Sequence, residues 1–381
     1  NIPFHGNQTI TPYWPNGLIN PKLSWEETKQ FDAGLDLEFF GNRLSLELDY
    51  YYRYTDKLLA QVTLPGDYNA YTAQWQNAYA ISNQGIELQI KADLIRSEKL
   101  HWDFSFNIAR NWNRFEKSNN GMDFTNLASK HNLNIIGKPL NGIYVYNDEG
   151  YYNSQDEVPL YYVNGRRKYL SSLGNQIYSP GDRRIQDVDG NGQVATMVPL
   201  LEDRVYGGSP LPLAFGGIAS TLKWKGIDVN LLFSYKLGRH VLNAGRGASV
   251  GTILRANTAE MMVPILADLD KVSFWQKPGD NTDFPINELE NGKNNFATNL
   301  KSNVEKINYL KLKSISIGYI LPVFPKQSKH YARVFMSVEN VFTITNSSSP
   351  DPESIDIVTG VDSNNNYPLA TRFTLGLTLN L

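Results

Sequence analysis

The sequence contains no cysteine, so neither disulfide bonds nor thiol chemistry can stabilise or drive this protein. It also lacks any apolar stretch as long as a transmembrane helix requires, and its mean hydropathy is −0.38. These absences exclude a disulfide-rich scaffold and a helical membrane protein. A membrane β-barrel stays possible, because barrel strands alternate apolar with polar residues and therefore have an unremarkable average hydropathy.

An excess of charge of one sign is missing as well. The formal net charge is −2 and no run of lysine or arginine occurs, so the sequence does not indicate the basic surface that a nucleic-acid-binding protein needs. Aromatic residues are abundant at 12%, with 22 tyrosines, and this composition favours strands and turns. No signal-peptide pattern follows Asn1, so we expect that such a segment was removed or lies outside this sequence.

Apolar residues recur at every second position in nine segments, which predicts nine β-strands. The first two cover residues 35–39 and 44–54, and Gly41-Asn42 forms the turn between them. The next six form three hairpins and the ninth ends the chain: residues 86–90 and 102–108, 218–224 and 229–235 around Lys225-Gly226, 310–320 and 331–340, and 373–381. The alternation changes phase near Lys313-Ser314, which predicts a β-bulge there.

The connections between these strands differ in length in a regular way. Within the pairs they are short, whereas between the pairs they are long: residues 55–83, 113–213, 236–308 and 341–370. Short periplasmic turns that alternate with long extracellular loops are typical of outer-membrane barrels. An odd number of strands cannot close a bacterial barrel of the usual even type, so we expect strands from elsewhere to pair with the last one.

The two faces of these strands carry different residues. A lumen filled by water or by a plug domain accepts charges that a packed core would not. We therefore predict that Leu46, Leu48, Phe104, Phe106, Leu231, Phe233, Leu375 and Leu377 face lipid, and that Glu47, Asp49, Asn107, Asn230 and Thr378 face the lumen. The alternative is a soluble β-sandwich whose polar face is simply its outside.

Several short motifs, taken in order, resemble the SusC/RagA-type TonB-dependent outer-membrane transporters of Bacteroidetes. The matching segments are Asn20 to Glu26, Gly34-Leu35-Asp36, Asn42-Arg43-Leu44, Asp49 to Tyr52, Ser82 to Glu87, Pro180-Gly181-Asp182, Asp187 to Gly192, Gly207 to Pro212, Glu339-Asn340, Asp351-Pro352-Glu353 and Tyr367-Pro368. Thr374 to Leu381 is similar to the family's barrel-assembly signal, although the family usually ends in Phe or Tyr.

The resemblance implies an all-β fold in which residues 1–381 are one unit, the C-terminal part of an antiparallel transmembrane barrel of about 22 strands with long extracellular loops. It also implies an outer-membrane importer of oligosaccharides or oligopeptides rather than an enzyme. The implied partners are membrane lipid, a SusD-like surface lipoprotein that closes over the mouth, and TonB, which acts through a plug segment outside this sequence.

The segment Asp187 to Gln193 matches the opening of an EF-hand-like calcium loop. Asp187, Asp189 and Asn191 would supply side-chain oxygens, and Gln193 its backbone carbonyl. The twelfth position, Val198, cannot bind the ion. By the resemblance, Asp203 corresponds to the carboxylate that precedes an arginine in the family, and it is our candidate for the closing ligand. The alternative is a plain turn without metal, because Asp, Asn and Gly also favour turns.

Other candidate sites are weaker. Trp75 and Trp275 lie in predicted loops and could stack on a substrate, whereas Trp102 and Trp224 fit the aromatic girdle of a membrane barrel. The five histidines show no metal-binding spacing, and no motif of a hydrolase, zinc protease or phosphate-binding loop occurs. An outer-membrane barrel enzyme and a soluble surface glycan-binding β protein remain the alternative functions.

Overall fold

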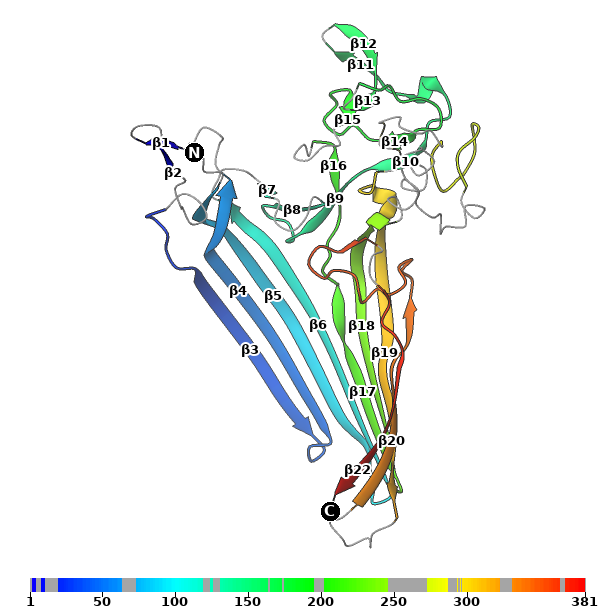
Figure 1. Cartoon of the computed structure of the whole chain (residues 1–381). Helices are drawn as coiled ribbons and strands as arrows, with labels where there is room; N and C mark the ends of the chain where they lie inside the picture. Colours follow the sequence, from blue (N-terminus) through cyan, green and yellow to red (C-terminus); the bar gives the residue numbers. More distant parts are fainter. Residues whose placement is uncertain are drawn as a thin grey trace.

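The computed structural model describes residues 2–4, 8–10, 20–63, 73–118, 124–125, 131–163, 165–172, 175–194, 202–245, 273–286, 293, 295, 297–322, 331–363 and 367–380. Its main feature is one long, curved sheet of nine strands, each hydrogen-bonded to the next (Figure 1). In spatial order the strands are β22 (Arg372–Asn380), β20 (Tyr331–Thr345), β19 (Val304–Leu321), β18 (Ile227–Asn243), β17 (Ala214–Trp224), β6 (Leu100–Ser118), β5 (Ala73–Arg96), β4 (Leu44–Thr63) and β3 (Glu27–Phe39).

The nine predicted strands are thereby confirmed, and all nine pair antiparallel with their neighbours. The strand register places apolar residues of neighbouring strands opposite one another, so the alternation seen along each strand continues from strand to strand. On one face, Ile90, Phe106, Ile218, Phe233 and Leu312 lie opposite one another in five successive strands. On the other face, Glu47, Gln89, Asn107, Gly217 and Ser234 do the same. The sheet therefore has one apolar and one polar surface.

Short turns join the hairpins at one end of the sheet, which we call the turn end. Lys225 and Gly226 have φ of 47° and 87° and link β17 directly to β18, the left-handed pair that suits a two-residue hairpin. Gly41 and Asn42 both have φ of 63° between β3 and β4. Both predicted turns are confirmed. The opposite end, the loop end, carries the long connections (Figure 1).

The strands extend much further toward the loop end than the alternation predicted. The expected loop 55–83 is wrong in its extent, because β4 continues to Thr63 and β5 begins at Ala73. The register shifts between Thr55 and Leu58, where Lys57 has φ of 57°, and this bulge breaks the period of two. Similarly, β18 passes through Gly238, at φ of 68°, to Asn243. The bulge predicted at Lys313-Ser314 is present on both sides of β19.

Two glycines on the polar face make room for a neighbouring aromatic ring. A Cβ on Gly85 would lie 2.6 Å from ring atoms of Tyr51, the residue opposite it on β4. A Cβ on Gly376 would lie 2.3 Å from the ring of Phe335, opposite it on β20. In both places the ring lies across the glycine backbone, so a larger residue would displace it.

The two edges of this sheet are β3 and β22. As expected, β22 pairs with β20 on one side, and among the described residues neither β22 nor β3 has a strand on its other side. The described chain therefore does not close into a small barrel, in which β22 would pair with β3. The short parallel strand β21 (Val361–Asp362) is added to β18 at the loop end, beside Leu242 and Asn243.

The connection between β6 and β17 folds into small sheets of its own. One contains β7 (Phe124–Thr125), β8 (Asn132–Ile135), β9 (Gly142–Tyr146) and β16 (Arg204–Gly208). The others are pairs: β10 (Asp148–Tyr151) with β14 (Arg183–Ile185), β11 (Leu160–Val163) with β12 (Arg166–Tyr169), and β13 (Ser171–Ser172) with β15 (Gln193–Val194). A further pair, β1 (Ile2–Phe4) with β2 (Gln8–Ile10), precedes β3. Two 3-10 turns span Gln155–Glu157 and Lys301–Asn303. None of the described helical segments is long and apolar enough to cross a bilayer.

Candidate functional site at the loop end

The described parts of residues 131–208 and 273–300 form a folded unit at the loop end, which we call the loop body. Its centre is a small core in which Tyr146 and Tyr178 are 0% exposed and Leu170 and Leu300 are 1% exposed. The long connections contact one another here, because Tyr146 N–H donates to the Asn299 carbonyl at 2.9 Å. The sequence shows no periodic signal for this core, because its members come from short segments that are far apart in the chain.

Asp182 holds two of these segments together. It is 0% exposed, and its Oδ2 accepts hydrogen bonds from Ser179 N–H at 2.7 Å and from the Lys293 ammonium at 2.8 Å. The Asn295 amide donates to its Oδ1 at 2.7 Å. The preceding Gly181 has φ of 89°, and a Cβ there would lie 2.5 Å from the Trp275 ring. The motif Pro180-Gly181-Asp182 thus packs the loop body.

Trp275 belongs to this packing. The residue is 6% exposed, so its ring is not open to a ligand, and the structure does not support it as a stacking platform. The physical reason is the space that Gly181 leaves beside it. Trp75 lies on β5 instead of in a loop and is 46% exposed, and its role in substrate binding stays a prediction.

The predicted calcium loop forms a compact series of turns. Asp187 Oδ1 accepts from Gly190 N–H and its Oδ2 from Gly192 N–H, both at 2.8 Å. Asp189 Oδ1 accepts from Asn191 N–H at 3.0 Å, and Asn191 Oδ1 accepts from Gln193 N–H at 2.7 Å. These bonds fix the side-chain oxygens around the turn.

Asp203 joins this loop, as proposed from the sequence. It is 0% exposed, its Oδ1 accepts from Val188 N–H at 2.9 Å, and a carboxylate oxygen of Asp203 lies within 4.8 Å of one from Asp187 and one from Asp189. Burial, followed by the negative charge of Asp187 and its neighbours, raises the pKa of the adjacent Tyr161 to about 12. Carboxylate oxygens of three residues, Asp187, Asp189 and Asp203, thus lie close together beside Tyr161.

A second connection, residues 346–362, lies against the polar face of β18 and β19, and we call it the strap (Figure 1). Lys311 on β19 is 3% exposed, and its ammonium lies 3.1 Å from Asp351 Oδ2 and 2.9 Å from Glu353 Oε2. Lys313 binds both oxygens of Glu353 at 2.8 Å. Burial opposes ionisation of both acids. Hydrogen bonds from backbone N–H groups and from Lys311 outweigh it at Asp351, and hydrogen bonds from Lys313 and Lys311 outweigh it at Glu353, so the pKa of each acid lies below its ordinary value.

Arg239 on β18 anchors the middle of the strap. It is 1% exposed and donates to the carbonyl oxygens of Pro210 at 2.9 Å, of Ile355 at 3.3 Å and of Asp356. The strap also contacts the loop body, since the Asn132 amide donates to the Thr359 carbonyl at 2.8 Å. Sequence reasoning missed Arg239 and Lys311. The only signal was the Asp351-Pro352-Glu353 motif, which did not reveal its partners.

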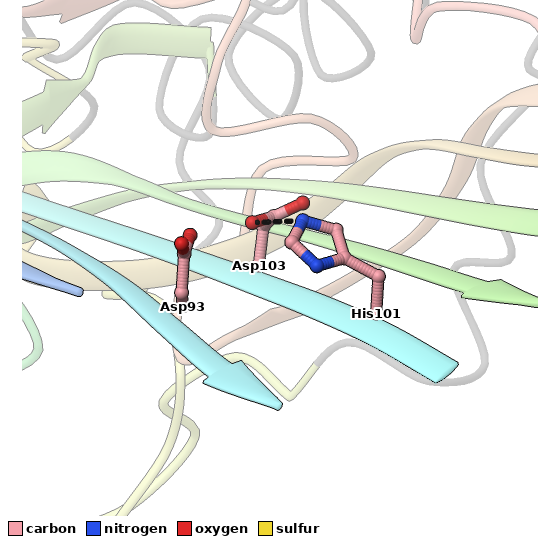
Figure 2. Close-up of side chains that lie close together, drawn as sticks. All are labelled: Asp93, His101 and Asp103. Atoms are coloured by element: carbon pink, nitrogen blue, oxygen red, sulfur yellow. Dashed lines mark ion pairs between the residues drawn. The ribbon is translucent and has the colours of Figure 1, made fainter. Parts of the chain in front are cut away.

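A different polar cluster lies near the turn end of β5 and β6 (Figure 2). Asp93 and Asp103 face each other across the two strands, and His101 Nε2 lies 3.0 Å from Asp103 Oδ1. The three side chains project from the same face of the sheet, and Arg96 approaches Asp93 at 3.8 Å. The spacing of histidines along the sequence did not reveal this cluster, because its residues lie on two different strands and are brought together by the pairing of β5 with β6. Its geometry is that of an ion pair of a histidine with a carboxylate.

Comparison with known proteins identifies the architecture. Residues 3–245 match the family model described as "TonB dependent receptor-like, beta-barrel". This chain belongs to that family. Proteins of this family are outer-membrane barrels, so this chain is an outer-membrane protein. The short turns of such barrels face the periplasm, and the loop body and the strap therefore lie on the extracellular side.

Individual relatives agree with this assignment. The chain is 29% identical to TonB-dependent receptor P3 of Formosa agariphila, with 98% of this chain and 36% of the relative covered. It is 25% identical to TonB-dependent receptor SusC of Bacteroides thetaiotaomicron, with 95% of this chain and 32% of the relative covered. The chain thus spans about a third of the length of these relatives.

Solved structures show the same fold. A structure of the RagAB peptide transporter matches with a TM-score of 0.64 at 24% identity, covering 94% of this chain and 36% of the other. The RagAB peptide importer in the open-open state matches with a TM-score of 0.65 at 23% identity, covering 96% and 36%. The expected resemblance to SusC and RagA, and the expected portion of a larger all-β barrel, are confirmed. The total of about 22 strands stays a prediction.

Proposed function

We propose that this chain forms part of the wall and the extracellular mouth of a TonB-dependent importer of oligosaccharides or oligopeptides. The observation that carries the proposal is the sheet itself: apolar on one face, polar on the other and, among the residues that the structure describes, without a further strand at either edge. In an outer-membrane barrel the apolar face meets lipid, the polar face lines the lumen, and further strands pair with the open edges.

In the proposed mechanism, substrate is captured at the mouth by the loop body and the strap. A SusD-like surface lipoprotein closes over them, and the substrate then enters the lumen when a plug domain rearranges under force from TonB. The rigid attachment of the strap to β18 and β19 through Lys311 and Arg239 supports this role, because it gives the mouth a fixed shape to present to a substrate.

The substrate class stays open between two candidates. The name of the relative SusC states no substrate, whereas the two RagAB structures are described as a peptide transporter and a peptide importer. The relatives are receptors and transporters, which supports a binding and transport role without catalysis. An outer-membrane barrel enzyme is the alternative, whereas the soluble surface glycan-binding protein is excluded because the chain belongs to a family of outer-membrane barrels.

Growth on defined nutrients tests the import function. A strain without the receptor should fail to grow on one oligosaccharide or oligopeptide mixture as sole source, and the wild-type gene should restore growth only when TonB is present. Loss of the gene for the proposed SusD-like lipoprotein should reduce the uptake of the same substrate. Full uptake without TonB would overturn the proposal, and turnover of a substrate by the purified protein would favour an enzyme.

We also propose that calcium binds between Asp187, Asp189, Asn191, the Gln193 carbonyl and Asp203, and stabilises the loop body. The convergence of three carboxylates supports this proposal, because repulsion among them would be relieved by a divalent cation held by oxygen ligands at about 2.3–2.6 Å. Calorimetry should show calcium binding that Asp187→Asn abolishes and that Glu149→Gln, a change at an acid outside the cluster, leaves intact. Equal binding by both variants would contradict the site.

A further inference from the structure

A mostly apolar cavity of about 450 Å³ opens at the extracellular mouth, between the polar face of the sheet and the strap. Leu58 on β4, Ile81 on β5 and Phe115 on β6 line one side, and Leu140 of the loop body and Val358 of the strap line the other. Its volume suits a small apolar group rather than a whole oligomer.

The cavity lies on the lumen side of the wall. Asn113 points to the same face as Asn107 and Asn111, and its Oδ1 accepts a hydrogen bond from Leu140 N–H at 3.0 Å, so the loop beside Leu140 crosses the polar face. The strap closes the other side, where the Asn132 amide links the Asn141 and Thr359 carbonyls at 2.8 Å each. A substrate passing from the mouth into the lumen therefore meets this cavity.

Apolar walls are unusual on this face. Phe115 is 0% exposed and packs beneath the cavity with Tyr79, whose ring centroid lies 5.6 Å away, whereas Leu58, Ile81 and Leu140, which pack against this pair, are only partly buried and form the open walls. By contrast, Val358 is 52% exposed at the tip of the strap. An apolar ligand group that covered this exposed side chain and the apolar walls beside it would remove apolar surface from water, which favours binding.

One charged group stands at the rim. Asp356 is exposed, and its Oδ1 accepts from Val358 N–H at 2.7 Å and from Thr359 N–H at 3.2 Å. Burial opposes ionisation, but these backbone bonds outweigh it and hold the pKa of Asp356 below its ordinary value. Arg239, whose positive charge acts on Asp356, is buried and directs its donors to carbonyl oxygens, and among the described residues that line the cavity Asp356 is the charged one.

We propose that this cavity is a subsite for an apolar side chain that adjoins a positively charged amine, the arrangement at the N-terminal residue of a peptide. The walls would cover the side chain and Asp356 would bind the α-ammonium, which is largely protonated at neutral pH. The inference rests on the proposed import function and deepens it, because an unmodified neutral oligosaccharide offers neither group. It favours peptides as the substrate class.

Three probes test it on the complete receptor, purified in detergent and studied by calorimetry: Phe-Gly-Gly, Gly-Gly-Gly and N-acetyl-Phe-Gly-Gly. Burial of one benzyl group predicts roughly tenfold or tighter binding of the first probe than of the second. Acetylation removes the charge, so the third probe should bind several-fold more weakly than the first. Asp356→Asn should erase the difference between the first and third probes while its Oδ1 still accepts the backbone bonds.

Two variants of the strap tip form a matched pair. Val358→Ser should weaken Phe-Gly-Gly binding several-fold, whereas Ile357→Ser, a change at a residue that is 55% exposed but does not line the cavity, should leave it unchanged. Equal affinity for Phe-Gly-Gly and Gly-Gly-Gly would overturn the subsite, as would equal losses in both variants. If none of the probes binds while TonB-dependent uptake of another solute persists, the subsite is refuted and the import function stands.

Discussion

The wall of strands and the loop body bury their apolar residues in different ways. In the wall, Leu375 on the edge strand β22 is 78% exposed, and Leu48 is 41% exposed although it lies on β4, which is paired on both sides. In the loop body, Tyr146 and Tyr178 are 0% exposed in an irregular fold. In the wall, lipid covers the apolar face, and hydrogen bonds between neighbouring strands keep the strands in register. The loop body covers itself, and a few long-range polar contacts determine its shape.

The largest expected effect is at Lys311, the residue through which the strap joins the wall. Lys311→Met removes the buried cation that pairs with Asp351 and Glu353. Because both carboxylates then lose this partner, the folded strap should be destabilised by about 3–5 kcal/mol. Hydrogen exchange should show loss of protection in residues 346–362 while β4, β5 and β6 stay protected. Adding Asp351→Asn should restore part of the protection. Loosening of the whole wall would mean that the two regions are one cooperative unit.

Adjacent residues on β5 test the two faces of the wall. Leu88→Arg places a charge toward lipid and should destabilise the folded barrel by about 2–4 kcal/mol near the bilayer midplane, whereas Gln89→Arg, on the polar face, should cost little. Denaturant titration of the receptor folded into vesicles measures both.

The same assignment predicts that a charged thiol reagent labels Asp49→Cys and not Leu48→Cys in intact membranes. The reverse pattern would contradict it.

Acidification should separate the strap from the wall. Because the folded-state pKa values of Asp351 and Glu353 are lowered, their ion pairs contribute stability above the unfolded values of about 4, and this contribution is lost as the pH falls through the lowered values. Protection of the strap should be constant from pH 7 to about pH 5 and decline below about pH 4. The central wall strands should stay protected. Parallel loss in both regions would argue against a locally held strap.

The smallest effect is spectroscopic and concerns the loop body alone. Tyr161 has its pKa raised to about 12 by burial and by the nearby carboxylates. Removing negative charge favours the tyrosinate, so Asp187→Asn should lower this pKa, and bound calcium should act in the same direction. The difference spectrum between the parent and Tyr161→Phe isolates this residue. An unchanged pKa after Asp187→Asn would show that burial dominates.

The same contrast explains what the sequence could predict. Alternation in segments such as Leu44–Tyr54 revealed the wall, because one face must be apolar in lipid and the period of two is unbroken. Bulges at Lys57 and near Gly238 hid the upper halves of β4 and β18, because one extra residue reverses the pattern. Asp203 was found only through a family resemblance, and Lys311 and Arg239 were missed, because their partners depend on folds of distant segments.

The length of β5 has a consequence for the shape of the entrance. Its 24 residues extend roughly 80 Å along the strand, and a tilt of about 45° leaves about 55 Å of height. The hydrocarbon slab is only about 30 Å thick. Roughly half of this strand therefore stands outside the bilayer as the side of an aqueous vestibule. Side chains in this part of the strand stand above the membrane surface, where contacts with other segments of the protein, such as those that bury Tyr79 and Ala80, replace contacts with lipid.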